Sequence, residues 1–245
     1  MKNLHLILGI LLIVLNSCIS VRNTPEKLIK PLYSASIEDA AYPTKDEINY
    51  NLIEINESNT KLKWKTIDGK KYILTATWVA EKDLGYYTKS SNYKTGTYSI
   101  WVTAIPDLKE RCEALKIEKS KDMSLRIEQL LGLPPNGDKT HFIEFWVQPK
   151  DLFRPCPDES ITDGSCDLCF PEGTNDEYKK WINNLRVKYY YNCEGDRYPW
   201  TQLGYTYDWH PRNKTHVGLS EFVIRANSDI IVHKIQATEK YLGIE

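Results

Sequence analysis

The segment from Leu62 to Trp78, LKWKTIDGKKYILTATW, predicts an antiparallel β-hairpin. Leu62 and Trp64 alternate with lysines before the turn pair Asp68-Gly69. A second alternating run follows that pair: Tyr72, Leu74, Ala76 and Trp78. Alternation of apolar and polar residues gives each strand one face toward a core, and Asp-Gly favours a two-residue hairpin turn. A sheet is therefore expected to start in this segment.

Four more segments have the apolar and β-branched composition of strands. They are Tyr98–Ala104, His141–Val147, Glu221–Ile224 and Ile230–Ile235. The residues from Ala226 to Asp229 favour a turn between the last two segments. We therefore expect these two strands to pair with each other as a closing hairpin.

Three segments show the helical period instead. The first follows Pro106, and its apolar residues recur at i, i+4 and i+7: Leu108, Cys112 and Leu115. Cys112 is therefore expected to be a small buried core residue. A second helix is expected over residues 122–131. The third starts with a capping box from Thr174 to Glu177, and its apolar stripe is Tyr178, Trp181, Ile182 and Leu185.

The order of these elements indicates the fold class. Strands and helices occur in blocks rather than in strict alternation, which favours α+β. We expect a mostly antiparallel sheet with about three helices packed on it and a disulfide-stapled loop. Residues 49–245 are expected to form this single globular domain.

The first eighteen residues have the order of an export signal. Lys2 precedes an apolar run from Leu6 to Leu15, and Ser17 comes just before Cys18. As a helix this run rises about 15 Å, half of what a membrane span requires. Leu15-Asn16-Ser17-Cys18 resembles the lipobox of bacterial lipoproteins, which implies that Cys18 becomes a lipidated first residue.

The resemblance also implies a location and an organisation. Residues 1–17 would be removed as a signal peptide, and residues 18–48 would be a lipidated tether. Pro25, Pro31 and Pro43 occur there among polar residues without a sustained period. The expected location is the cell envelope, anchored in a membrane by lipid. Ile19 after the cysteine favours the outer membrane.

The charge of the chain argues against nucleic acid as a partner. Lys and Arg number 32 and Asp and Glu number 33, for a formal net charge of −1. No basic run is present, whereas binding to phosphates depends on clustered Lys and Arg. No sequence motif indicates a cofactor, and we expect neither a cofactor nor a metal.

Four cysteines downstream of Cys112 are the disulfide candidates: Cys156, Cys166, Cys169 and Cys193. Four thiolates could instead hold a structural zinc, or some could stay reduced. Export to an oxidising compartment favours disulfides. The preferred pairing joins Cys156 to Cys166 or Cys169, and the remaining one to Cys193.

The aromatic segment from Tyr198 to Trp209 is the main candidate for binding. We expect the protein to be a non-enzymatic envelope lipoprotein that binds a glycan, a peptide or a protein. Its contact residues would be Trp200, Tyr205, Tyr207 and Trp209. A further possibility is a scaffold subunit with an exposed apolar patch.

The alternative is an exported hydrolase or transferase with Asp208, His210 and Glu221 in acid, base or electrostatic roles. This hypothesis requires the three side chains to meet in one pocket, with at least one perturbed pKa. The strand that begins at Ser220-Glu221 resembles the glutamate-bearing strand of ADP-ribosyltransferases, although Leu219 stands where that family often has Glu or Gln. The segments Asp151–Pro155 and Leu203–Trp209 resemble segments of exported bacterial proteins without assigned activity, and this resemblance implies no chemistry.

Overall fold

The computed structural model describes residues 25–88, 91–120, 122–192 and 195–244, and they form an α+β fold around one antiparallel sheet of nine strands. The strands are β1 (Trp64–Ile67), β2 (Lys70–Ala80), β3 (Asn92–Lys94), β4 (Ile100–Ala104), β5 (Lys139–Val147), β6 (Leu152–Phe153), β7 (Tyr205–Tyr207), β8 (Val217–Ile224) and β9 (Asp229–Ala237). The order across the sheet is β3-β9-β5-β2-β4-β8-β6, while β1 pairs with β2 and β7 with β8.

The helices are α1 (Glu26–Ala40), α2 (Asp107–Ala114), α3 (Met123–Leu130), α4 (Asp176–Arg186) and the short α5 (Thr238–Tyr241). A π-helical turn (Val187–Tyr191) continues α4. The α+β class and the mostly antiparallel sheet are thus confirmed. None of the helices in the described ranges is long and apolar enough to cross a membrane.

The predicted hairpin is confirmed as β1 and β2, with Ile67 opposite Lys70. Asp68 and Gly69 both have positive φ, 48° and 73°. This is the backbone that a two-residue turn between twisted strands requires. β2 continues past the hairpin and pairs with β5 from Ile73 to Ala80, which places it in the middle of the sheet.

The predicted closing hairpin is wrong, because β8 and β9 do not pair. β8 pairs with β4, β6 and β7 along its length, so it leaves no edge for β9. β9 instead lies between β3 and β5. The connection between them is held by another segment: Asn227 N donates to Gly96 O, and Ser228 N donates to Thr95 Oγ1.

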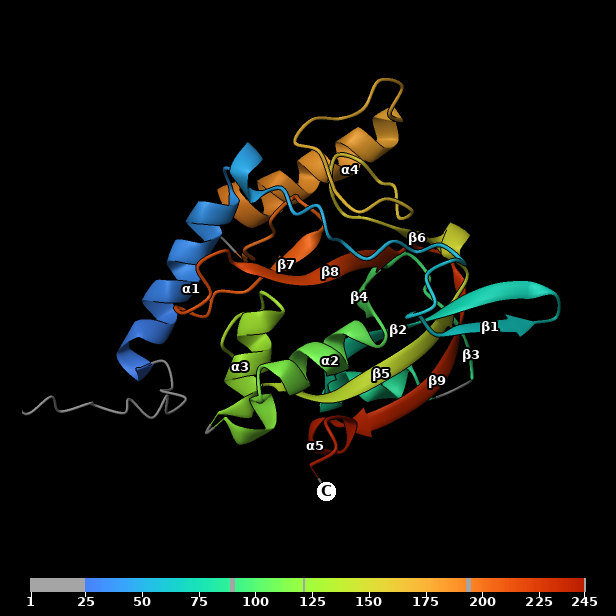
Figure 1. The fold of residues 1–245 in the computed structure, drawn as a ribbon, viewed down its shortest axis with the longest axis horizontal. Helices are drawn as coiled ribbons and strands as arrows, with labels where there is room; N and C mark the ends of the chain where they lie inside the picture. The colour runs from blue at the N-terminus through green and yellow to red at the C-terminus, as the bar shows by residue number, and fades with distance from the viewer. Residues whose placement is uncertain (1–24, 89–90, 121, 193–194, 245) are drawn as a thin grey trace, which may run out of the picture.

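Two groups of helices cover the same face of the sheet at different places. α2, α3 and α5 pack over β2 and β5 (Figure 1), where Leu108, Ile127 and Leu130 join Leu74 and Trp78 in one apolar cluster. α4 lies beside β6 and β8, where Tyr178 and Ile182 pack on Phe153 and Val223. Cys112 is buried in the first cluster as predicted.

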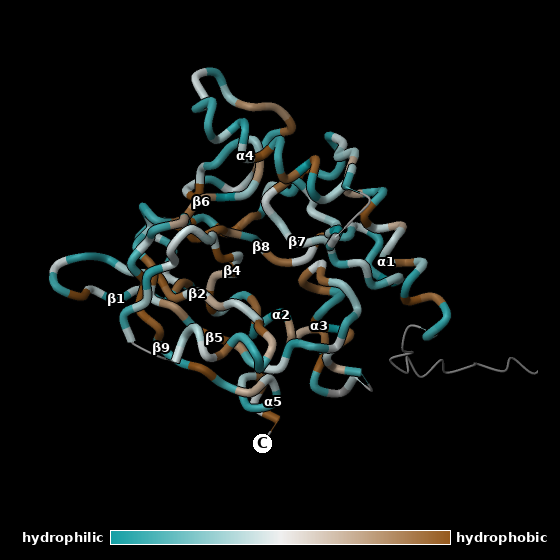
Figure 2. The backbone as a smooth tube through the Cα atoms, turned by 180° about the vertical axis from the view of Figure 1, so that it is seen from behind, coloured by the Kyte–Doolittle hydropathy of each residue, from teal (hydrophilic) through white to brown (hydrophobic). Residues whose placement is uncertain are grey.

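Seen from behind, hydrophobic stretches gather in the central strands, whereas the turn between β1 and β2 is mostly hydrophilic (Figure 2).

The N-cap of α4 differs from the prediction by one residue. The Asn175 side chain accepts hydrogen bonds from Glu177 N and Tyr178 N, so Asn175 is the cap. Thr174 Oγ1 instead donates to Pro171 O. Asn is as good a cap as Ser or Asp, which is why the sequence allowed either position.

Within the tether predicted for residues 18–48, Glu26–Ala40 forms the helix α1. The helix has an apolar stripe that the three prolines obscured: Ile29, Leu32, Tyr33, Ile37 and Ala40. It packs beside β7 and α3 (Figure 1). The Tyr33 ring lies 5.6 Å from the Trp209 ring, and Tyr207 Oη donates to Asp39 Oδ2 at 2.6 Å. α1 is thus part of the folded domain.

The cysteine loop contains the disulfide Cys156–Cys166, one of the two pairings preferred for Cys156. Cys169 is exposed with a free thiol, and its predicted partner Cys193 lies outside the described residues. With two of the four sulfurs joined to each other, the four-thiolate zinc site is not formed. Cys18 also lies outside the described residues.

Candidate functional site

The four aromatic residues expected to contact a partner are buried in the structure. Their exposed fractions are 4% for Trp200, 3% for Tyr205, 5% for Tyr207 and 2% for Trp209. Each polar tip bonds inside the protein: Trp200 Nε1 donates to Pro155 O, Tyr205 Oη to Glu47 O, and Trp209 Nε1 to Leu133 O. These four side chains are therefore enclosed in the fold and do not form an exposed surface. Trp200, Tyr207 and Trp209 belong to apolar clusters that include residues of α1, whereas Tyr205 packs with Leu52 and Leu203.

The sheet itself creates a cavity, because β2 and β4 pair over only two positions. Thr75 lies opposite Ala104 and Ala76 opposite Thr103. Beyond this point β2 stays with β5 as far as Ala80, while β4 stays with β8 as far as Ile100. The two strands therefore separate, and a cavity of about 770 Å³ lies at the separation. We call it the Glu221 cavity.

Aromatic side chains dominate the lining of the Glu221 cavity. Trp101 of β4, Tyr189 of the π-helical turn and Trp200 meet at ring-centroid distances of 6.2–6.5 Å with interplanar angles of 61–86°. Two tyrosines at the cavity are largely exposed, Tyr86 and Tyr98. Volumes of 300–1,000 Å³ with mostly apolar walls and few polar groups are typical of ligand sites.

Glu221 and Asp83 are the acidic residues in the lining of this cavity, and Glu221 is partly buried. On β8 it lies between Leu219, which packs with α2 and α3, and Val223, which packs with α4. Residues two apart on a strand share a face, so Glu221 occupies the gap between the two helix groups. It also lines a smaller cavity of about 100 Å³ next to Thr103 and Leu108. Burial raises its pKa from 4.5 to about 8, and no ion pair opposes this among the described residues.

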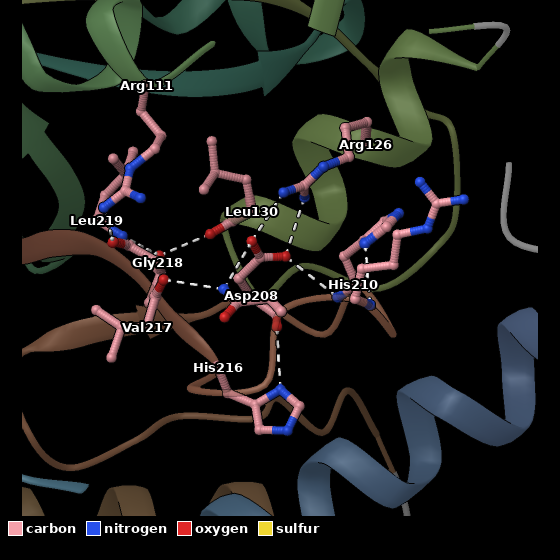
Figure 3. Close-up of polar contacts among 12 residues, drawn as sticks. Arg111, Arg126, Leu130, Asp208, His210, His216, Val217, Gly218 and Leu219 are labelled. Carbon is pink, nitrogen blue, oxygen red and sulfur yellow. Dashed lines mark hydrogen bonds and ion pairs between the residues drawn. The ribbon is translucent and has the colours of Figure 1, made fainter. Parts of the chain in front are cut away.

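Asp208 and His210 line a different cavity of about 720 Å³, the Asp208 cavity. Arg126 extends from α3 to the Asp208 carboxylate (Figure 3). Its Nη1 donates to Oδ1 at 2.9 Å and its Nη2 to Oδ2 at 2.8 Å. The carboxylate also accepts from His210 N and Asn213 Nδ2. With four donors and 3% side-chain exposure, Asp208 is a structural anion that ties α3 to the loop after β7.

His210 does not form an acid–base pair with this carboxylate. Its backbone amide, rather than its ring, contacts Asp208. Burial and the nearby Arg126 and Arg212 lower the pKa of the His210 ring. A second histidine, His216, stacks on Tyr207 at 4.6 Å with its Nδ1 3.3 Å from Asp208 O.

The structure therefore does not bring the three predicted catalytic residues together. Asp208 and His210 line one cavity, and Glu221 lines the other. The pKa is perturbed at His210 in one cavity and at Glu221 in the other. The three-residue catalytic site is overturned by this separation.

Sequence reasoning missed most of the Glu221 cavity. The sequence predicts Tyr98 and Trp101 as residues of one strand and assigns neither of them to a site. It assigns no role to Tyr189. The separation of β2 from β4 depends on which neighbours each strand has, and no local pattern shows it. The sequence does contain one signal, because Glu221 is the charged residue of a mostly apolar strand, Val217–Ile224.

Within the described ranges, no group of three or more His, Cys, Asp or Glu side chains is arranged to hold a metal ion. Comparison of the chain with protein-family models, with curated proteins and with solved structures found no match. The geometry of the cavities is therefore the basis for assigning a function.

The buried ion pair predicts a large loss of stability when one partner is removed. Arg126→Met leaves the Asp208 charge buried without its counter-ion, and we expect the free energy of unfolding to fall by about 3–5 kcal/mol. Arg212→Met, an exposed arginine of the same cavity, should change it by less than about 0.5 kcal/mol. Urea unfolding followed by circular dichroism measures both. Equal losses in the two variants would contradict a structural role for the pair.

The raised pKa of Glu221 predicts a pH dependence of stability. The folded protein binds a proton with a pKa of about 8, whereas the ordinary value is 4.5. Folding therefore holds a proton that the unfolded chain releases, and this contribution to stability is full below 4.5 and lost as pH rises to 8. Glu221→Gln should remove that decline, so the variant should gain relative to the wild type between pH 5 and 8. Parallel curves of unfolding free energy against pH would show that Glu221 titrates normally.

Proposed function

We propose that this chain is a binding protein of the bacterial cell envelope, anchored through a lipid on Cys18, that takes a small organic ligand into the Glu221 cavity. The observation that carries the proposal is the Glu221 carboxyl, which lines an aromatic cavity and has no hydrogen-bond or ion-pair partner within the described residues. Burial raises the pKa of this carboxyl, while the side chain keeps partial exposure to the cavity. Such groups are concentrated at functional sites.

The shape and chemistry of the cavity support a ligand of small or medium size. About 770 Å³ can enclose a body larger than an amino acid, and the rings of Trp101, Tyr189 and Trp200 offer apolar contact. Trp200 and Tyr207 from the predicted contact set line this cavity, whereas Tyr205 and Trp209 do not. The binding surface is thus an internal cavity in this proposal, in place of the exposed aromatic segment.

Two features support the location in the envelope. Residues 15–18 resemble a lipobox, and the Cys156–Cys166 disulfide is typical of oxidising compartments. An anchored domain with an internal cavity would hold its ligand close to a membrane surface.

A neutral fluorescent probe tests whether the cavity binds ligands. N-phenyl-1-naphthylamine, which fluoresces in apolar surroundings, should bind the full-length protein with saturable one-to-one stoichiometry. Ser99→Trp places an indole in the cavity lining and should weaken binding by about tenfold or more. Thr97→Trp, two residues earlier, exposed and outside the lining, should bind as the wild type does. Absent or non-saturable fluorescence, or equal binding by both variants, would exclude the cavity as the binding site.

The anchor is tested separately in a bacterial expression host. Cys18→Ala removes the residue that would carry the acyl chains, so the protein should move from the detergent-extracted membrane fraction to the soluble fraction. Cys112→Ala, a buried thiol of the core, should remain in the membrane fraction. Mass spectrometry of the wild type should show the acylated N-terminal cysteine. An unmodified N-terminus with unchanged fractionation would reject the lipoprotein assignment.

A further inference from the structure

The Glu221 carboxyl lacks a positive charge near it. Lys139 and Lys188 line the same cavity, but burial is the only cause that acts on the pKa of Glu221. The Lys188 ammonium lies 5.2 Å from the centroid of the Tyr189 ring, where the ring holds it. Neither lysine therefore serves as the counter-ion of Glu221, and the position for one is open to a ligand.

A second polar atom next to Glu221 also lacks a partner. Thr103 of β4 lies directly opposite Glu221 of β8 in the antiparallel register. Directly opposed residues have their side chains on the same face, about 5 Å apart. Thr103 Oγ1 is buried and has no hydrogen-bond partner among the described residues. The two neighbouring strands thus present a carboxyl and a hydroxyl side by side, both able to accept hydrogen bonds.

The rings around this pair suit a positive charge as well as an apolar body. Trp101 and Trp200 stand nearly perpendicular, at 86° and a centroid distance of 6.5 Å. Aromatic faces carry partial negative charge and attract cations, with Trp the strongest. An ammonium group has three donors and no acceptor, so it matches two unused acceptors beside aromatic rings. A neutral hydroxyl has one donor and leaves the charge without a partner.

We propose that the ligand of the Glu221 cavity is an organic cation whose apolar body packs against Trp101 and Trp200. Its primary ammonium group is bound by Glu221 and by Thr103, which lines the smaller cavity that Glu221 and Trp101 also line. This inference rests on the proposed function, because it identifies the class of ligand for the same cavity. A neutral amphipathic ligand such as a sugar is the competing outcome.

Two probes of matched shape separate charge from apolar contact. 2-Phenylethylamine carries an ammonium group where 2-phenylethanol carries a hydroxyl. Isothermal titration of the full-length protein at pH 8.5 should give an affinity for the amine at least about tenfold higher than for the alcohol. Glu221→Gln keeps the shape of the side chain and should abolish this preference.

Glu144→Gln is the matched control variant. Glu144 is also a partly buried carboxylate of the central sheet, 3.8 Å from His233 and outside the cavity lining. It should keep the preference for the amine. Thr103→Val removes the hydroxyl at nearly constant volume and should weaken binding of the amine more than binding of the alcohol. Circular dichroism melts establish that each variant is folded.

The pH dependence in the wild type gives a measurement that needs no variant. Glu221 must release its proton before it can pair with the ammonium, so binding of the amine should weaken by about 25-fold from pH 8.5 to pH 6.5 if the pKa is about 8. Binding of the alcohol should not. The other charged groups of the lining are Asp83, Lys139 and Lys188. Burial raises the pKa of Tyr189 and of Tyr198, so these two lining tyrosines stay neutral.

The outcomes distinguish this inference from the proposed function. Equal affinity for the two probes, or a preference for the amine that survives in Glu221→Gln, overturns the inference. Saturable binding of the neutral dye without any binding of the amine also overturns it, but leaves the cavity as a binding site. If neither the dye nor the amine binds, both proposals are wrong.

Discussion

The two-residue contact between β2 and β4 is the constraint on which the rest of this molecule depends. In the centre of the nine-stranded sheet, the two strands pair at Thr75–Ala104 and Ala76–Thr103, and Ile105 N donates one further hydrogen bond to Leu74 O. On one side β2 and β5 carry the cluster under α2 and α3, and on the other β4 and β8 carry the cluster under α4. The short contact keeps the two halves in one sheet while it leaves space between them.

Asp208 and Glu221 differ in the number of hydrogen-bond partners around their carboxyl groups. Asp208 is surrounded by four hydrogen-bond donors, including both Nη atoms of Arg126, and so has no capacity left for a ligand. Glu221 has none of these partners in the described structure and lines a cavity. A carboxylate thus stabilises the fold at Asp208, whereas the carboxyl of Glu221 can bind another group. Proximity of Asp, His and Glu in the sequence carried no information about this difference.

The fold could be predicted from the sequence where local patterns decide it. The turn at Asp68-Gly69, the stripe of α4 and the buried Cys112 all follow from spacing within a few residues, and the structure has them. Pairing of β8 with β9 was mispredicted, because a short connection favours a hairpin only if the edges are free, and β4, β6 and β7 occupy those of β8. α1 is not predicted, because three prolines occur among polar residues in this part of the chain, and Pro31 lies inside the helix. Its apolar stripe from Ile29 to Ala40 outweighs one lost hydrogen bond.

The site was harder to predict than the fold for the same reason. Aromatic composition identified Trp200 and Tyr207, but exposure could not be inferred from it, since the segment packs under α1. The sequence identifies Glu221 as a candidate site residue, but it groups Glu221 with Asp208, which lines a different cavity. Thr103, which lies opposite Glu221, is 118 positions away in the sequence. The register of β4 against β8 brings the two residues together, and no pattern in a single sequence reveals that register.

The position of α1 limits how far the domain can travel from a membrane. If Cys18 carries the lipid, only seven residues separate it from Glu26, where the helix begins and the chain becomes part of the folded body. Even fully extended, that stretch reaches about 28 Å, less than the thickness of a bilayer with its headgroups. A long tether would let the domain sample the whole envelope space. This one would confine ligand capture to a thin layer at the lipid surface, so the local concentration there, rather than in the bulk compartment, would set the occupancy of the cavity.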